Sequence, residues 1–187
     1  LDLVVPNDAI KITQDFAKQL GVTSIVLDAE RDMARLVFQG WTIDVAKQIG
    51  PSLEKDLWRR DFRLNAIALM LGPNPKIVDP TGGIEDLHRK KLVAVQEKNF
   101  IEDPLRCLRG LRLMAELNFS LAPQTRTFIN TYSHLLSKAA PERIQSELQR
   151  IVSVEAADEV IKLLTEIGLL DLWSNKNDSF QRDIPAV

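Results

Sequence analysis

The sequence has few of the residues from which many catalytic and structural sites are built. It holds one cysteine, Cys107, which excludes a disulfide framework and a zinc site made from cysteines. No apolar run reaches the roughly 18 to 20 residues of a membrane span, and the N-terminus lacks a signal-peptide pattern. We therefore expect a cytoplasmic protein without a membrane anchor. The formal net charge is only −2, so any surface that binds nucleic acid must be local.

The remaining composition is that of an ordinary globular protein. Hydrophobic residues make up 45% and charged residues 27% of 187 positions, enough for one large domain or two small ones. Strand-like and helical patterns alternate up to about residue 96, and from Asp103 onward only helical patterns follow. This order predicts an α+β fold with a small mixed β-sheet, followed by an all-helical part.

Two helices of the first part can be placed by their ends. Residues 9–20 have helical spacing, with Asn7 or Asp8 as the N-cap and Gly21 just beyond the last turn. Residues 61–71 have the pattern of an amphipathic helix that ends at G-P-N-P. The other predicted elements are strands at 1–5, 23–27, 34–39, 41–46, 77–78 and 92–95, and helices at 104–117, 123–137, 141–153 and 155–167.

The densest group of polar residues on an apolar frame lies at 58–68, in W-R-R-D-F-R-L-N-A-I-A. Arg60, Asp61 and Asn65 alternate there with apolar anchors, which is typical of a pocket wall. Guanidinium groups bind phosphate well, and a carboxylate can accept a hydrogen bond from a ribose hydroxyl. We predict that this stretch forms half of a nucleotide site.

A second group lies in E-D-P-L-R-C-L-R-G-L-R at 102–112. One interpretation is structural: Asp103 caps a helix whose first position is proline, and Glu102 pairs with Arg106 four residues on. The other is functional: Arg106, Arg109 and Arg112 recur every third residue and form a slowly winding basic ridge. Near a helix N-terminus such a ridge suits a triphosphate or an RNA backbone. The spacing alone leaves both interpretations open.

Two aspartates lie within strand-like runs, Asp2 in the first and Asp44 between Ile43 and Val45. Carboxylates on neighbouring strands can hold a divalent ion, because Mg²⁺ prefers oxygen ligands together with substrate phosphates. The alternative for each is an exposed position on an edge strand.

Together these motifs resemble the class II tRNA nucleotidyltransferases and the bacterial poly(A) polymerases of the polymerase-β-like superfamily. The resemblance runs from Leu1 to about Val152, and several ordered motifs at compatible spacing carry it. They are D-L-V-V at 2–5, R-R-D-F-x-x-N-A at 59–66, D-P-x-G-G-x-x-D-L at 79–87, E-D-P-x-R-x-L-R-x-x-R at 102–112 and A-A-P-E-R-I at 139–144.

The resemblance implies a role for the strand aspartates. Asp2 corresponds to the second of two metal-binding aspartates in a D-x-D strand, and Asp44 to a third acidic residue on a neighbouring strand. The first aspartate would precede Leu1, together with a glycine-rich phosphate-binding segment. Because both are missing, we expect the sequence as written to be an N-terminally truncated palm that cannot catalyse efficiently.

The resemblance also implies roles in nucleotide binding. Asp61 would bind the ribose, with Arg60 and Asn65 forming that wall. Asp103 and Arg106 would read the edge of cytosine or adenine. Two further residues complete the implied site: Glu102 would hold Arg106, and Arg109 would meet the triphosphate.

The implied reaction is metal-assisted attack of an RNA 3′-hydroxyl on the α-phosphate of CTP or ATP, with Mg²⁺ as cofactor and the tRNA 3′ end as partner. The implied domains are a nucleotidyltransferase head at 1–96, a helical neck with the base-selection helix at 97–153, and the start of an RNA-binding helical body at 154–187. The oligomeric state stays open.

Two alternatives remain beside a tRNA nucleotidyltransferase: a poly(A) polymerase, and a non-catalytic RNA-binding relative. Within the first group, only residues 45–58 link Asp44 to Arg59. Members that add the whole CCA end usually carry a longer flexible loop there, so the short link favours a CC-adding enzyme.

Overall fold

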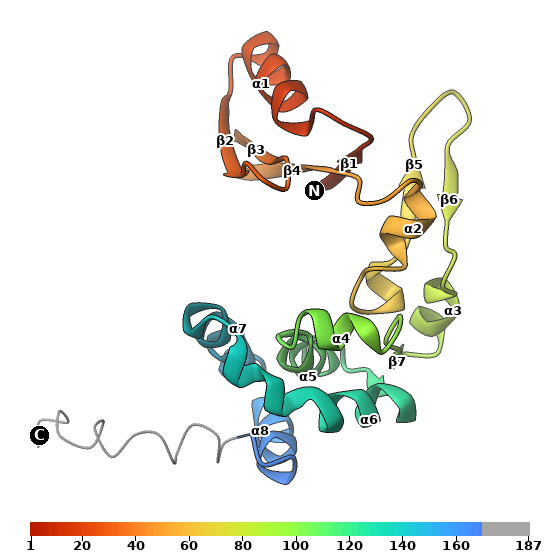
Figure 1. The fold of residues 1–187 in the computed structure, drawn as a ribbon, viewed down its shortest axis with the longest axis vertical. Helices are drawn as coiled ribbons and strands as arrows, with labels where there is room; N and C mark the ends of the chain where they lie inside the picture. The colour runs from red at the N-terminus through yellow and green to blue at the C-terminus, as the bar shows by residue number, and fades with distance from the viewer. Residues whose placement is uncertain (170–187) are drawn as a thin grey trace, which may run out of the picture. The chain divides into compact units, whose positions relative to one another are not determined.

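The computed structural model describes residues 1–169 (Figure 1). Contacts within the chain divide it into two compact units, Leu1–Asp56 and a second unit that begins at Leu57. Each unit is described by itself below. The predicted domain boundaries after residues 96 and 153 are not tested by this division and stay predictions, and residues 170–187 of the predicted body lie outside the described part.

The first unit is a four-stranded sheet with one helix against it (Figure 1). The strands follow the spatial order β1-β4-β3-β2; β1 runs parallel to β4 and the other neighbours are antiparallel, so the sheet is mixed, as predicted. Helix α1 (Ala9–Leu20) covers one face. The strands are β1 (Asp2–Val5), β2 (Thr23–Asp28), β3 (Met33–Phe38) and β4 (Trp41–Lys47), and the buried residues of this layer are Ala9, Thr13, Ala17, Ala34, Leu36 and Val45.

The two ends of α1 differ in how well the sequence predicts them. Gly21 adopts a left-handed conformation with φ 65° and its N–H bonds to the carbonyl of Ala17, which confirms the predicted end. At the start, Asp8 makes no capping bond. The carboxylate of Asp32, in the turn before β3, accepts the N–H groups of Ala9 and Ile10 at 3.0 and 2.9 Å instead. A cap supplied from a distant turn leaves no local sequence signal.

The second unit is mainly helical, and its four longer helices lie where the periodicity predicts them. No helix in the described residues is long and apolar enough to cross a membrane. These helices are α5 (Arg106–Leu117), α6 (Pro123–Tyr132, continued by the 3₁₀ helix η2, Ser133–Lys138), α7 (Pro141–Val152) and α8 (Ala157–Glu166).

Several short elements lie before and between these helices. Helix α2 (Leu53–Leu57) spans the junction of the two units. Strands β5 and β6 form a hairpin, and β7 and β8 form a two-residue parallel pair. The helical spacing of apolar residues in the sequence does not predict helices α3 and α4. The bounds are η1 (Arg63–Asn65), β5 (Ala68–Met70), β6 (Lys76–Val78), α3 (Gly83–His88), β7 (Lys91–Leu92), α4 (Lys98–Glu102) and β8 (Ser120–Leu121).

The predicted helix over residues 61–71 is wrong. Phe62 is extended and forms an antiparallel bridge with Ala94: the N–H of Val95 bonds to the carbonyl of Asp61 at 3.0 Å, and the N–H of Arg63 to that of Val93 at 2.9 Å. A single 3₁₀ turn and strand β5 follow. Leucine, alanine and methionine in this stretch favour a helix only weakly, and pairing with a distant segment overrides that preference.

Phe62 anchors this extended stretch in the core of the second unit. It is fully buried and meets Phe100 edge-on, with ring centroids 5.8 Å apart. Gly110 of α5 lies against the same ring, and a Cβ added there would stand 2.8 Å from Phe62 Cζ. The missing side chain therefore allows α5 to approach the R-R-D-F motif closely, which brings two sequence motifs together.

Candidate nucleotide-binding site

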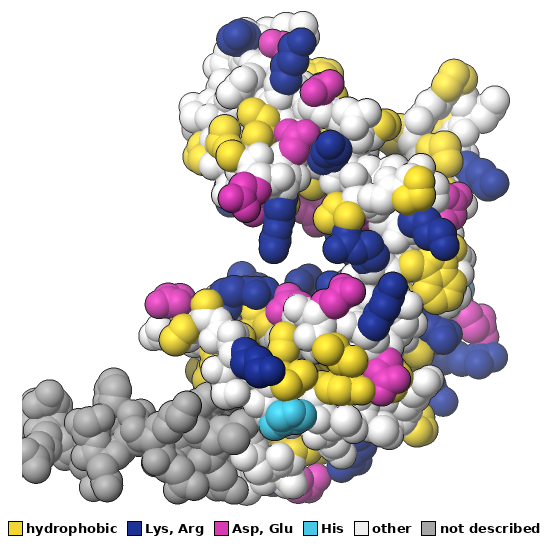
Figure 2. All heavy atoms as spheres, in the orientation of Figure 1, with side chains coloured by type: hydrophobic (Ala, Val, Ile, Leu, Met, Phe, Trp, Pro, Cys, Tyr) yellow, Lys and Arg dark blue, Asp and Glu magenta, His cyan; other side chains and the backbone are white. Residues whose placement is uncertain are grey.

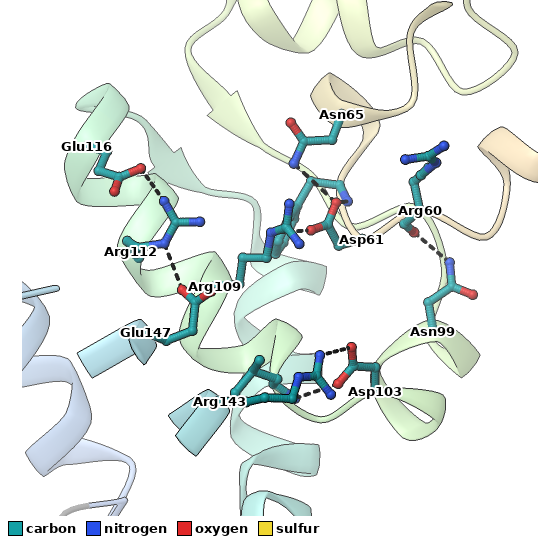
Figure 3. Close-up of polar contacts among 12 residues, drawn as sticks. Arg60, Asp61, Asn65, Asn99, Asp103, Arg109, Arg112, Glu116, Arg143 and Glu147 are labelled. Carbon is teal, nitrogen blue, oxygen red and sulfur yellow. Dashed lines mark hydrogen bonds and ion pairs between the residues drawn. The ribbon is translucent and has the colours of Figure 1, made fainter. Parts of the chain in front are cut away.

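Asp61 is the residue around which the second unit gathers its other polar side chains (Figure 3). It is only 5% exposed. Its Oδ1 accepts hydrogen bonds from the backbone N–H of Phe62 at 2.8 Å and from Nδ2 of Asn65 at 3.1 Å. Its Oδ2 lies 2.8 Å from Nε of Arg109 on α5, in an ion pair whose N–H direction does not give a hydrogen bond. The structure thus brings together Asp61, Asn65 and Arg109.

Asn99 fixes the backbone just before Asp61. It is fully buried on α4, and its Nδ2 donates to the carbonyls of Trp58 at 3.0 Å and Arg60 at 2.7 Å. One amide therefore satisfies two carbonyls of the W-R-R-D stretch. Figure 3 shows the guanidinium of Arg60 extending away from the Asp61 carboxylate, while its carbonyl faces Asn99. The backbone of Arg60 belongs to this wall more closely than its charged group.

Arg106, the first residue of α5, brings an unpaired donor to the site. Its Nη1 is buried and has no hydrogen-bond partner among the described residues. Burial lowers the pKa of its guanidinium, while the charges of Asp61, Asp103 and Glu102 oppose that effect. Glu102 attracts Arg106 without forming a direct ion pair in the described part of the chain. A buried donor without an acceptor costs about 1–3 kcal/mol, so an oxygen or ring nitrogen of a ligand would be favoured here.

Asp103 precedes α5 and is held by two donors. Its Oδ1 accepts the N–H of Leu105 at 3.3 Å, which gives the structural interpretation one capping bond. Its Oδ2 accepts Nη2 of Arg143, on α7, at 2.9 Å. A carboxylate has about four acceptor positions, so Asp103 keeps capacity for a base. Capping and base reading are therefore compatible.

The three arginines of the ridge do not share one environment. Arg109 is exposed and pairs with Asp61, whereas Arg112 is 7% exposed and faces α7. Arg112 Nε donates to Glu147 Oε2 at 2.7 Å, and its Nη1 donates to Glu116. Burial would lower the pKa of Arg112, but its bonds to both glutamates raise it. Its nucleotide-binding role stays a prediction, and this pairing does not support it.

Charged side chains of both signs lie on this part of the second unit. Figure 2 shows Lys and Arg side chains over α4 and α5 with acidic side chains between them. Charges of both signs therefore alternate on this face, and the whole chain has a net charge of −2. The site combines cationic groups for phosphates with carboxylates for hydroxyl and amino groups.

The predicted metal carboxylates belong to the first unit. Asp2 and Asp44 are directly opposite each other on parallel strands β1 and β4, so their side chains share the face that α1 leaves uncovered. Arg35 of β3 holds both oxygens of Asp44, at 2.6 and 2.7 Å, and lowers the pKa of that carboxyl.

The donor chemistry of this pair suits Mg²⁺. No cluster of three or more acidic, histidine or cysteine ligands exists within residues 1–169. Mg²⁺ is commonly bound through one or two carboxylates plus substrate phosphates and water, so the two aspartates fit this donor chemistry. Asp44 would have to share its oxygens between the metal and Arg35, whereas Asp2 is exposed.

Four residues of these two clusters are not predicted from the sequence: Arg35, Asn99, Arg143 and Glu147. Arg35 lies opposite Asp44 in the β3–β4 register, a relation that a hairpin model of these strands could have given. Arg143 belongs to the A-A-P-E-R-I motif, and Glu147 follows it by one helical turn, so helical spacing places both on one face of α7. Asn99 has no signal of this kind.

Comparison with known proteins identifies relatives of both units. Residues 31–93 match the family model described as "Poly A polymerase head domain", and residues 118–173 match "Probable RNA and SrmB- binding site of polymerase A". A CC-adding tRNA nucleotidyltransferase of Synechocystis sp. is 39% identical over 172 residues, which cover 92% of this chain and 41% of the relative.

Relatives named for other activities are about as similar. An A-adding tRNA nucleotidyltransferase of Deinococcus radiodurans is 38% identical over 161 residues, which cover 83% of this chain and 36% of that protein. A solved tRNA nucleotidyltransferase with a primer tRNA and an incoming ATP analog is 30% identical with a TM-score of 0.78, covering 91% of this chain and 53% of that one. The chain spans about two fifths of the length of the curated relatives it matches.

Proposed function

Because the chain belongs to the family of the class II tRNA nucleotidyltransferases and the bacterial poly(A) polymerases, we propose that the protein adds C, A or both to the 3′ end of tRNA. The substrates would be CTP and ATP, and no nucleic-acid template would be used. The 3′-hydroxyl of the RNA would attack the α-phosphate, and pyrophosphate would leave.

The observation that carries this proposal is the buried, unpartnered Nη1 of Arg106 beside Asp61 and Asp103. Arginine is a donor only, and an ionised carboxylate is an acceptor only. A cytosine edge offers a carbonyl acceptor and an amino donor, and an adenine edge offers a ring-nitrogen acceptor and an amino donor. Arg106 and Asp103 would match either edge, so the protein itself would select the base.

Each remaining residue would then have a defined task. Asp61, held by Asn65, would accept a hydrogen bond from the ribose, and Arg109 would contact the triphosphate from the exposed face of α5. The two strand aspartates of the first unit, Asp2 and Asp44, would hold a divalent metal. When bound, that metal would supply positive charge against the phosphate oxygens and acidify the attacking hydroxyl. Mg²⁺ as this metal and the cytoplasm as the location are parts of the same proposal.

The test is the product formed by the purified full-length protein on a tRNA that ends just before CCA, with CTP alone, ATP alone and both nucleotides. A product extended by one to three residues supports the proposal. A long A-tail with ATP would identify a poly(A) polymerase, and no extension, with RNA binding retained, would favour the non-catalytic alternative. Relatives named CC-adding and A-adding are 39% and 38% identical to this chain, so similarity does not separate these subtypes. The products with CTP alone, ATP alone and both nucleotides do separate them.

A pair of arginine variants tests the site itself. Arg109→Gln should weaken CTP binding because it removes the cation next to Asp61. Arg89→Gln is the matched control: Arg89 is also exposed and also pairs with a carboxylate, Glu85, at 2.7 Å. Equal CTP affinity in the two variants would show that Arg109 does not contact the triphosphate.

A further inference from the structure

We propose that helix α3 is a positioning element of the nucleotide site, acting through a backbone contact between Gly83 and Arg63. This contact would hold the turn that carries Asn65 against Asp61, and so would set the preference for ribonucleotides over deoxyribonucleotides. The inference rests on the proposed function. It gives a role to the D-P-T-G-G-I-E-D-L motif, which the nucleotide site described above leaves unused.

The contact itself leaves no room for a side chain. A Cβ added to Gly83 would stand 2.1 Å from the carbonyl oxygen of Arg63 and 3.0 Å from Cγ1 of Ile67. Real Cβ contacts below 3.0 Å are essentially never seen, and the nearest atom here belongs to the backbone. Gly83 does not have the positive φ of its neighbour Gly82, so close approach alone requires the glycine.

The carbonyl that Gly83 touches is also the one that closes turn η1. The N–H of Ala66 donates to Arg63 O at 2.9 Å, and this bond shapes the turn Arg63–Asn65. A second tie joins the same elements: Asp86 Oδ2 of α3 lies 3.9 Å from Nη1 of Arg63. Helix α3 therefore packs on the turn at its backbone and at a side chain.

A tight cap holds α3 in its place. The carboxylate of Asp79 accepts the N–H groups of Gly82, Gly83 and Ile84 at 3.0, 2.8 and 2.9 Å. Burial would raise the pKa of Asp79, but these backbone bonds together lower it, so the cap stays charged at neutral pH. A helix of only six residues depends on such a cap and on its packing.

Turn η1 connects the contact between Gly83 and Arg63 to Asp61 of the nucleotide site. Asn65, its last residue, donates from Nδ2 to Asp61 Oδ1 at 3.1 Å. Separating Gly83 from Arg63 until an added Cβ had ordinary van der Waals contact, at 3.4 Å or more instead of 2.1 Å, would need a shift of about 1.3 Å. A shift of that size takes a 3.1 Å bond out of hydrogen-bond range. Asp61 would then lose one of the donors that orient its oxygens toward a ribose hydroxyl.

The experiment compares Gly83→Ala with Gly72→Ala, a matched control whose added Cβ would meet nothing within 4 Å and whose φ is not positive. Calorimetry would give the dissociation constants of CTP and dCTP for each protein, and thermal melting would give its stability. We expect Gly83→Ala to lower the CTP-over-dCTP preference about fivefold, the value of one hydrogen bond, and Gly72→Ala to leave it unchanged. Asn65→Ala should lower the preference equally, and adding Gly83→Ala to it should change nothing further.

The outcomes separate this inference from the proposed function. A wild-type preference in Gly83→Ala together with a lower melting temperature would overturn the inference, because α3 would then only stabilise the fold. If Gly83→Ala does not fold, Asp79→Asn weakens the cap without adding any atom to the contact. An unchanged CTP-over-dCTP preference in folded Asp79→Asn would also overturn the inference. Failure of the wild-type protein to bind CTP would overturn the proposed function and this inference with it.

Discussion

Removing one partner of the buried Arg112–Glu147 pair should destabilise the second unit far more than it affects nucleotide binding. Arg112 is 7% and Glu147 8% exposed, and the pair joins α5 to α7 across a 2.7 Å hydrogen bond. The perturbation is Arg112→Met, which keeps an unbranched apolar stem in place of the first part of the arginine side chain but leaves the Glu147 carboxylate buried without its cation.

The magnitude follows from this burial. Leaving one member of a buried ion pair without its partner costs about 3–5 kcal/mol. The second carboxylate, Glu116, has a side chain that is 34% exposed, so its contribution is discounted to that of a helix surface pair, about 0.3–0.5 kcal/mol. Against a total stability of about 5–15 kcal/mol, the loss should be easy to measure. The double variant Arg112→Met/Glu147→Met removes both charges and should cost less than either single change.

Urea unfolding followed by circular dichroism at 222 nm gives the free energies of unfolding for this cycle. CTP affinity of the folded variants is measured in parallel. Arg126→Met is the control, since Arg126 and its partner Glu166 on α8 are both more than half exposed: it should leave unfolding nearly unchanged. The reasoning fails if Arg112→Met costs less than about 1 kcal/mol, or if the double variant costs the sum of both single changes. A tenfold loss of CTP affinity in stable Arg112→Met would establish Arg112 as a nucleotide ligand.

Three further predictions follow from individual side chains. Burial raises the pKa of Asp86. The protonated Asp86 therefore contributes stability below the pKa of an unfolded carboxyl, and this contribution is lost as the pH rises through the raised pKa. Asp86→Asn should raise the melting temperature more at pH 7 than at pH 4. Arg35→Gln should increase Mn²⁺ affinity several-fold, measured by electron paramagnetic resonance, because Asp44 loses its competing cation; adding Asp44→Asn should abolish the gain. Asn99→Asp should cost about 1–3 kcal/mol in urea unfolding, and no less than Asn99→Ala, because it cannot donate to the two carbonyls that Asn99 satisfies.

The elements that the sequence predicts well are those whose shape depends on local pattern. Residues 9–20 and 141–152 repeat apolar positions at helical spacing, and both are helices. The stretch 61–71 fails because its structure is decided by pairing with 93–95 and by burial of Phe62 against Gly110. No window of the sequence contains both partners, so local periodicity cannot reveal the contact.

The same limit applies to the candidate site. Asp61 and Asn65 lie four residues apart, and the motif alone places them on one wall, where the structure joins them. The partners of Arg112 lie on its own helix and on α7, and only the packing of α5 against α7 brings Glu147 within reach. Residue type and spacing identify the ridge, and the tertiary contact decides which of its members remain available to a ligand.

The winding of the arginine ridge around α5 explains why Arg106 and Arg109 face Asp61 whereas Arg112 faces α7. A step of three residues turns about −60° around an α-helix, so Arg106 and Arg112 point about 120° apart. One side of α5 therefore carries Arg106 and Arg109 toward Asp61, and another carries Arg112 toward α7. Helix α7 meets both ends of this turn, because Arg143 holds Asp103 before α5 and Glu147, one turn later, holds Arg112. The two ties hold the first turns of α5 against α7, and Arg106, with its buried and unpaired Nη1, lies within these turns.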